Sequence, residues 1–182
     1  MYYRLPPRCD KSFHPYNRDA AVEYARKWAL GRNPAFKDYS TMGGDCTNFV
    51  SQCLLAARIP FITRGNSDAD KWYWFDDEVR VPSWTGVVPF RSFLLTNNTN
   101  HTCDLGAFAA LCAYGEVEPG DIIQRAVNGR LVHTMIATQI LKDTQGQTVD
   151  ILICGHSFDA LDRSLATVPG DMSYIKIYGY YA

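Results

Sequence analysis

The sequence predicts an α+β domain, in which helices from the first half of the chain pack on an antiparallel sheet from the second half. Apolar residues recur at helical spacing before residue 96, and after Pro119 the pattern changes to that of strands. Asn128-Gly129, between two strand-like segments, is a strong signal for a two-residue hairpin turn. No repeat or linker interrupts the chain, so residues 1–182 are expected to form a single domain.

Two helices are predicted most clearly in the first half of the chain. Asn17 can cap a helix that ends near Gly31, because Asn33-Pro34 follows. A second helix is expected from Cys46 to about Arg58, followed by a short helix capped by Thr85. Residues 104–114 are expected to form a further short helix.

Four strands are expected from β-branched and aromatic residues in the second half. They cover residues 121–127, 130–140, 149–154 and 174–181, with a second tight turn near residues 143–146.

Composition excludes several classes of protein. The 18 basic residues nearly cancel the 19 acidic ones, so the basic excess typical of nucleic-acid binders is absent. No apolar run reaches the roughly 18 residues of a membrane span, so no membrane partner is expected. The first ten residues lack an apolar h-region, so the chain as given is not expected to carry a signal peptide. Both a cytoplasmic location and secretion after removal of a leader stay open, as does the oligomeric state.

Most of the six cysteines are expected to be buried thiols, because none forms a C-x-x-C pair. Cys46 is different, since it follows Gly43-Gly44-Asp45 and begins a predicted helix. Asp45 is expected to cap that helix by accepting a backbone hydrogen bond. The helix dipole and the unpaired N–H groups of the first turn would favour the thiolate and could hold an oxyanion.

The predicted hairpins suggest partners for this thiol. Counting back from Asn128-Gly129 places Gln124 opposite His133, and a turn centred on residues 144 and 145 places His156 opposite His133. The three side chains would then form one row, with His133 as the base of a nucleophilic cysteine. A zinc site formed by Cys46, His133 and His156 is conceivable from ligand type, but the ligand spacing is not characteristic, so no metal is expected.

Several motifs resemble the bacterial putative amidase domain family, in that family's order. They are Tyr16-Asn17-Arg18, Gly43-Gly44-Asp45-Cys46-Thr47-Asn48-Phe49-Val50-Ser51-Gln52-Cys53, Pro82-Ser83-Trp84-Thr85, Pro119-Gly120-Asp121, His133-Thr134 and His156-Ser157-Phe158-Asp159. The family in turn resembles the NlpC-type and CHAP-type cysteine hydrolases of papain-like fold. This resemblance implies a papain-like domain in which Cys46, His133 and His156 are catalytic.

The resemblance implies a cysteine-dependent amidase or peptidase that works through a thioester acyl-enzyme without a cofactor. Its substrate would be a peptide or an amide of the bacterial cell wall. Trp84 and Gln124 are expected to contact substrate, and Asp159 or Asp162 is an alternative to His156 as the group that orients His133. A deamidase or transferase could use the same residues. The alternative from another class is an inactive papain-like module that binds glycan or peptide.

Overall fold

The computed structural model describes residues 11–99 and 105–182, apart from the side chains of residues 97–99. The helices of this part are α1 (Arg18–Trp28), α2 (Cys46–Ala56), α3 (Pro82–Thr85) and α4 (Val87–Thr99). Short 3-10 turns are η1 (Asp68–Asp70), η2 (Tyr114–Glu116) and η3 (Leu165–Thr167). The strands are β1 (Phe13–Pro15), β2 (Gly106–Cys112), β3 (Ile122–Val127), β4 (Arg130–Lys142), β5 (Thr148–Gly155), β6 (Ala160–Ser164) and β7 (Asp171–Tyr181).

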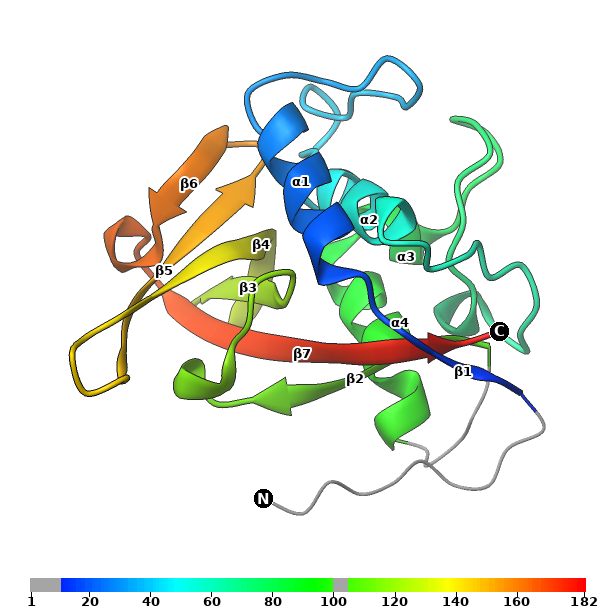
Figure 1. Ribbon diagram of the computed structural model, residues 1–182. Helices are drawn as coiled ribbons and strands as arrows, with labels where there is room; N and C mark the ends of the chain where they lie inside the picture. The colour runs from blue at the N-terminus through cyan, green and yellow to red at the C-terminus, as the bar shows by residue number, and fades with distance from the viewer. Residues whose placement is uncertain (1–10, 100–104) are drawn as a thin grey trace.

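These strands form one seven-stranded sheet, in which all the paired strands are antiparallel. Its order is β1-β7-β3-β4-β5-β6, and β2 also pairs with β7. Figure 1 shows the long strand β7 running beneath the helices, with β3 to β6 beside α1 and α2. The α+β class predicted from the sequence is therefore confirmed, with helices mainly in the first half and most strands in the second.

The clearest local signals are confirmed. Asn17 caps α1, because its side chain accepts a hydrogen bond from the N–H of Ala20. The hairpin between β3 and β4 turns at Asn128 and Gly129, with φ of 50° and 73°. Positive φ at both central residues is what a type I′ turn requires, and asparagine and glycine tolerate it.

Two expectations about the middle of the chain are wrong. The segment predicted as a helix over residues 104–114 forms β2, although Asp104 itself lies outside the described residues. Its alanines favour a helix locally, but pairing with β7 buries Ala107 and Ala109 in the core. Thr85 ends α3 instead of capping the next helix, which begins at Val87.

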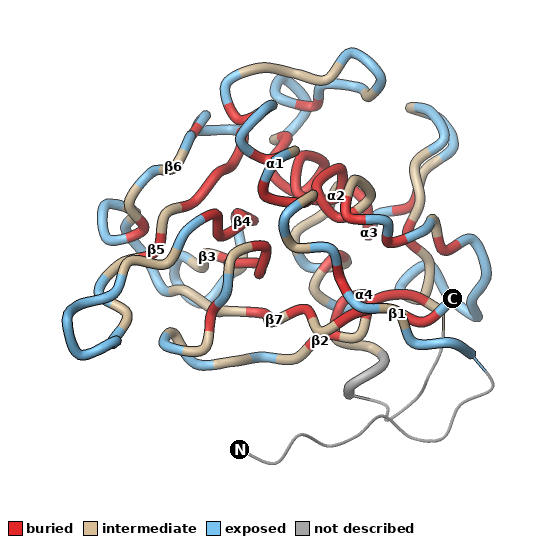
Figure 2. Tube along the Cα trace, viewed as in Figure 1, coloured by how far each residue is buried: buried red, intermediate tan, exposed pale blue. Residues whose placement is uncertain are grey.

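The core lies on both faces of the sheet. One apolar cluster joins the helices to Ile122, Ile136 and Cys154. A second cluster on the other face contains Ile123 and Met135. Neighbouring residues of a strand point to opposite faces, which explains the division. Figure 2 shows that α2 is buried along most of its length. Across the described ranges, no helix is long and apolar enough to cross a membrane.

Asp121 ties the sheet to the first helix. Its Oδ1 accepts hydrogen bonds from Arg18 Nη1, at 2.7 Å, and from the N–H of Ile177, at 3.0 Å. The preceding Gly120 has φ of 89°, which suits glycine. The Pro-Gly-Asp motif thus directly precedes β3 and sets its position against α1 and β7, which in turn places β4 beside α2.

Candidate active site

Cys46 is the first residue of α2, as the sequence predicts. Asp45 precedes it, but the Asp45 side chain makes no capping hydrogen bond, so the predicted cap is wrong. Its Oδ1 instead accepts from the N–H of Tyr39, at 3.0 Å, and from Asn48 Nδ2, at 2.8 Å. The Asp45 carboxylate therefore leaves the N–H groups of the first turn of α2 without a side-chain cap.

The other Asp45 oxygen holds His156. His156 Nδ1 lies 2.6 Å from Asp45 Oδ2, and its Nε2 lies 2.9 Å from the carbonyl oxygen of Trp28. The ring also stacks on Phe49, with centroids 4.0 Å apart, and only 1% of His156 is exposed. Contacts with Asp45, Trp28 and Phe49 therefore hold the His156 ring in place between α1 and α2.

These contacts occupy both ring nitrogens of His156. The Trp28 carbonyl can only accept, so Nε2 carries the hydrogen of that hydrogen bond. Nδ1 is held by Asp45 Oδ2, and Arg32 Nε lies 3.7 Å from the same oxygen. Neither nitrogen of His156 is therefore free to orient His133 or to accept the proton of Cys46.

The predicted row of three side chains is wrong, because the strands contain bulges. Between β3 and β4 a register shift lies at Arg125 and Ala126, so Gln124 pairs with Thr134 and Arg125 pairs with His133. A single extra residue moves a side chain to the other face of the sheet. Gln124 is thus on the face of α2, whereas His133 points to the opposite face.

The register of the second hairpin, between β4 and β5, also differs from the predicted one. Ile136 pairs with Cys154, after further register shifts in β4 and β5. Continued by two residues, this register places His156 opposite Thr134 rather than opposite His133. The hydroxyl of Thr134 lies 3.1 Å from that of Thr47 in α2, which identifies the face on which His156 also lies.

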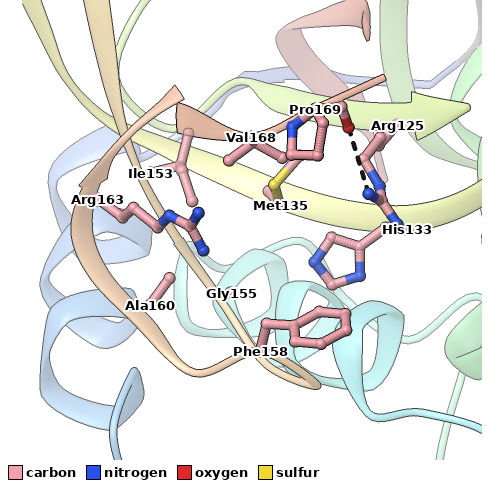
Figure 3. A pocket seen from close by; sticks show the side chains of 10 residues that line it. All are labelled: Arg125, His133, Met135, Ile153, Gly155, Phe158, Ala160, Arg163, Val168 and Pro169. Atoms are coloured by element: carbon pink, nitrogen blue, oxygen red, sulfur yellow. Dashed lines mark hydrogen bonds between the residues drawn. The ribbon is translucent and has the colours of Figure 1, made fainter. Parts of the chain in front are cut away.

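His133 lines a cavity of about 210 Å³ on the other face of the sheet. Figure 3 shows its ring between Phe158 and Arg125. Only 8% of the residue is exposed. Burial, and next the nearby Arg125 guanidinium, lower the pKa of His133 from 6.5 to about 4. His133 is therefore neutral at physiological pH, with a ring nitrogen able to accept a proton.

The turn between β5 and β6 connects the start of α2 to His133. In this turn the Ser157 hydroxyl accepts a hydrogen bond from the N–H of Asp45, at 2.9 Å. The next residue, Phe158, packs its ring edge-on against His133, with centroids 6.2 Å apart. Cys46 does not line the cavity, and across the described ranges no hydrogen bond joins its thiol to His133. The turn therefore contacts both the start of α2 and His133, although Cys46 and His133 are not hydrogen-bonded to each other.

Neither residue predicted to bind substrate is accessible. Trp84 is completely buried, and its Nε1 donates to Asn48 Oδ1 at 2.8 Å. Gln124 is completely buried as well, and its Nε2 donates to the carbonyl of Val87 at 2.9 Å. The expectation that these side chains contact substrate is not supported, because both satisfy polar groups of the core.

A polar network behind Cys46 was not anticipated. The hydroxyls of Thr47 and Thr134 meet at 3.1 Å, and Gln124 Nε2 lies 3.4 Å from the latter. Arg91 Nη1 then donates to Gln124 Oε1, at 3.2 Å, and to Ser173 Oγ, at 2.9 Å. No local pattern in the sequence marks these residues, because they come from five separate elements.

Asp159, the alternative orienting group, does not reach His133. Its carboxylate binds Arg32 through two hydrogen bonds of 2.8 and 3.2 Å. Arg32 also faces Asp45 and Asp38, so it links this turn to the loop before α2. Asp159 thus has a structural role at the same end of the helix. Asp162, the other alternative, accepts hydrogen bonds from Arg26 Nε at 3.0 Å and from Thr138 Oγ1 at 2.5 Å, and among the described residues no hydrogen bond joins it to His133.

The remaining thiols of the described residues are unsuited to nucleophilic chemistry. Burial raises the pKa of Cys53 well above its ordinary value and raises that of Cys154, and it brings that of Cys112 to about 11. Cys53 is a core residue, as predicted. In the part of the chain that the structure describes, no group of three or more His, Cys, Asp or Glu side chains could hold a metal ion.

Together, the fold and the site define an α+β domain with a helix-start thiol and a neutral histidine on an adjoining strand. A family model described as "Putative amidase domain" matches residues 15–180. The chain belongs to this family, and membership indicates an amidase-type function.

Two proteins of Bacillus subtilis (strain 168) are similar to this chain. Uncharacterized protein YhbB is 36% identical over 123 residues, which cover 66% of this chain and 36% of that protein. Uncharacterized protein YjcM is 30% identical over 132 residues, which cover 68% of this chain and 28% of that protein. The chain therefore matches only about a third of the length of these relatives. No solved structure matches it.

Proposed function

We propose that this domain is a cysteine-dependent amidase or peptidase that hydrolyses an amide bond through a thioester. The observation that carries the proposal is the placement of Cys46 at the first residue of α2, where no side chain caps the helix. The helix dipole stabilises a thiolate there, and the N–H groups of the first turn can stabilise an oxyanion.

Residues of this chain can carry out each chemical step of the reaction. Neutral His133 takes the proton of the Cys46 thiol, and the sulfur attacks the amide carbonyl, so that a carbon–sulfur bond forms and the negative charge moves to the carbonyl oxygen. The carbon–nitrogen bond then breaks, and protonated His133 gives its proton to the leaving amine. Water attacks the thioester while His133 takes one of its protons; the carbon–sulfur bond breaks, His133 returns this proton to the Cys46 sulfur, and the acid leaves.

His133 suits the role of base better than His156. Both ring nitrogens of His156 are hydrogen-bonded to protein groups, whereas the low pKa of His133 keeps its ring neutral and able to accept a proton. His133 must come closer to Cys46 than it lies in this structure. The turn at Ser157 and Phe158 contacts both regions, so a shift of that turn would change their separation. Catalytic hydrogen bonds often tighten only when substrate binds.

The proposed substrate class is a peptide or cell-wall amide, and the proposed fold is papain-like. Both rest on the resemblance of Gly43-Gly44-Asp45-Cys46 and His133-Thr134 to cell-wall cysteine hydrolases. The family's amidase description agrees with the reaction class. The chain itself offers a thiol and a base, which is the minimum that this chemistry needs.

The first test is alkylation with iodoacetamide, followed by peptide mapping. Cys46 should be modified much faster than the other cysteines near neutral pH, and His133→Gln should slow its modification. Cys112 is the matched control, because it is more exposed than Cys46, yet its pKa of about 11 keeps it a thiol.

The second test measures release of amines from a library of peptide amides and cell-wall fragments. Cys46→Ala should abolish the release while the circular dichroism spectrum stays unchanged. Equal alkylation of Cys46 and Cys112, together with undiminished activity of the Cys46→Ala variant, would refute the proposal. Binding of a fragment without turnover by the wild type would favour the inactive binding module.

A further inference from the structure

The cavity beside His133 has a composition that the thiol chemistry does not explain. Its floor and walls are mainly apolar, and two arginines stand on opposite sides of it (Figure 3). Its lining residues are Arg125, His133, Met135, Ile153, Gly155, Phe158, Ala160, Arg163, Val168 and Pro169. No aspartate or glutamate is among them.

Among the residues that the structure describes, neither arginine has an acidic partner. Arg125 Nη1 donates to the carbonyl of Pro169 at 3.2 Å, while its Nε is buried without any hydrogen-bond partner. Arg163 donates to the hydroxyl and carbonyl oxygens of Thr167, at 2.9 and 3.1 Å. Within the described ranges neither forms an ion pair, whereas Arg18, Arg26, Arg32 and Arg80 do.

The two guanidinium groups differ in exposure: Arg163 is exposed, whereas Arg125 is half-buried and its Nε has no acceptor. A buried donor without an acceptor loses the free energy of its hydration, and an anion bound beside Arg125 would supply the missing partner. A guanidinium is also the group best suited to bind a carboxylate through two hydrogen bonds. Arg125 and Arg163 supply positive charge to the cavity. Met135, Ile153 and Val168 supply its apolar surface.

The volume limits the size of the ligand. At about 210 Å³, the cavity is smaller than the roughly 300–1,000 Å³ typical of sites for drug-sized molecules, so it admits one residue-sized group. Phe158 stands at its edge, 70% exposed, with its ring against His133. An apolar side chain could therefore enter the cavity while the rest of a peptide continues along the surface.

We propose that this cavity is a binding site for an apolar, residue-sized group that carries a carboxylate, held between Arg125 and Arg163. The proposal deepens the proposed function by naming the substrate class, and it rests on that function only for the role of His133. Since His133 lines the same cavity, the amide bond that is cleaved would lie within about one residue of the carboxylate.

The test is a binding titration by NMR on the Cys46→Ala variant, so that no turnover can occur. N-acetylleucine supplies a terminal carboxylate, the α-amide of N-acetylglutamate supplies a side-chain carboxylate, and N-acetylleucinamide is the neutral control. At least one acid should bind about ten-fold more tightly than the neutral amide, since a charge-assisted bidentate contact is worth that much. Which acid binds better identifies the source of the carboxylate.

Variants assign the binding to the cavity. Arg125→Met and Arg163→Met keep the aliphatic stem and should each weaken binding of the acid about ten-fold while leaving the neutral amide unchanged. Arg130→Met is the matched control, because Arg130 is an exposed arginine at the start of β4, outside the cavity. The methyl signal of Met135 should shift on titration.

Equal binding of acids and amide, or unchanged binding in both cavity variants, would overturn the inference. These outcomes are separate from the fate of the proposed function. If the acids bind as expected but Cys46 never forms a thioester, only the proposed hydrolase activity is refuted and the carboxylate site stands. If neutral and acidic amides are hydrolysed with equal kcat/KM, and the arginine variants have no effect, the hydrolase stands and the carboxylate site is wrong.

Discussion

Two histidines of this protein lie on opposite faces of the same sheet and have opposite surroundings. His156 is packed between α1 and α2, where Asp45 and the Trp28 carbonyl occupy both of its ring nitrogens. His133 lines a cavity, and across the described ranges no protein group is hydrogen-bonded to its ring. A saturated histidine can stabilise a fold but cannot move a proton, whereas an unpaired neutral one can.

At the start of α2, one set of residues serves the stability of the fold and another set serves the proposed chemistry. Asp45 and His156 hold the loop and the turn around the helix N-terminus, so they fix where Cys46 lies. His133 and the two arginines of the cavity make few contacts that stabilise the fold. Substitutions on the two faces should therefore have different consequences.

The largest effect is expected from His133→Gln. If His133 is the base, turnover of an amide substrate should fall by about 10²–10⁴-fold, because general acid–base catalysis contributes that much. The midpoint of urea unfolding should stay close to that of the wild type. His14→Gln, in strand β1, is the matched control and should keep full turnover. Wild-type turnover of the His133→Gln variant would remove His133 from the mechanism.

The opposite pattern is expected from His156→Ala. Removing it leaves the buried Asp45 carboxylate without its partner, so the free energy of unfolding should fall by about 3–5 kcal/mol. Urea unfolding measures this loss. Asp45→Asn should cost much less, because an amide N–H can donate to Nδ1 of a neutral His156 while Nε2 still donates to Trp28. Equal losses for the two variants would contradict the proposed ion pair.

Stability should also depend on pH through His133. The pKa in the folded state, about 4, is below the ordinary value of 6.5, so the unfolded chain binds more protons between these values. Stability from this residue is therefore complete above about pH 6.5 and is lost as pH falls toward 4, by about 3 kcal/mol in all. His133→Gln should remove this part of the pH dependence, as measured by unfolding between pH 4 and 7. An unchanged slope would show that His133 is not buried in its neutral form.

A smaller change in the same direction should follow Arg125→Met. The Arg125 guanidinium is the second cause that lowers the pKa of His133, after burial. Its removal should raise that pKa, which an NMR titration of the His133 ring would report. Arg130→Met should leave the titration unchanged. A pKa of His133 that stays near 4 in Arg125→Met would mean that burial alone sets it.

The smallest effect is expected from Cys53→Ser, two turns further along α2 than Cys46. Cys53 is completely buried, so a serine hydroxyl there should cost about 1–3 kcal/mol of stability. Alkylation of Cys46 should be unchanged, which a rate measurement with iodoacetamide would check. A loss of Cys46 reactivity would show that the helix interior controls the thiol.

Local sequence determined much of this fold. Asn17 and Asn33-Pro34 bound α1, Gly43-Gly44 precedes the start of α2 at Cys46, and Asn128-Gly129 forms the predicted hairpin. These signals act through the conformations of a few adjacent residues, so they can be recognised without knowing what packs around them. The burial of Cys53 followed from the helical period in the same way.

Only the tertiary structure decided which side chains meet. The bulge at Arg125 and Ala126 separates Gln124 from His133, and no residue type marks it in the sequence. The alanine-rich segment Gly106–Cys112 became a strand because β7 offered it a partner. His156 bonds to Asp45, 111 residues away, because two separate elements pack together. One inserted residue reverses the face of a strand, and pairing across a long separation depends on the whole core, so local patterns cannot specify either.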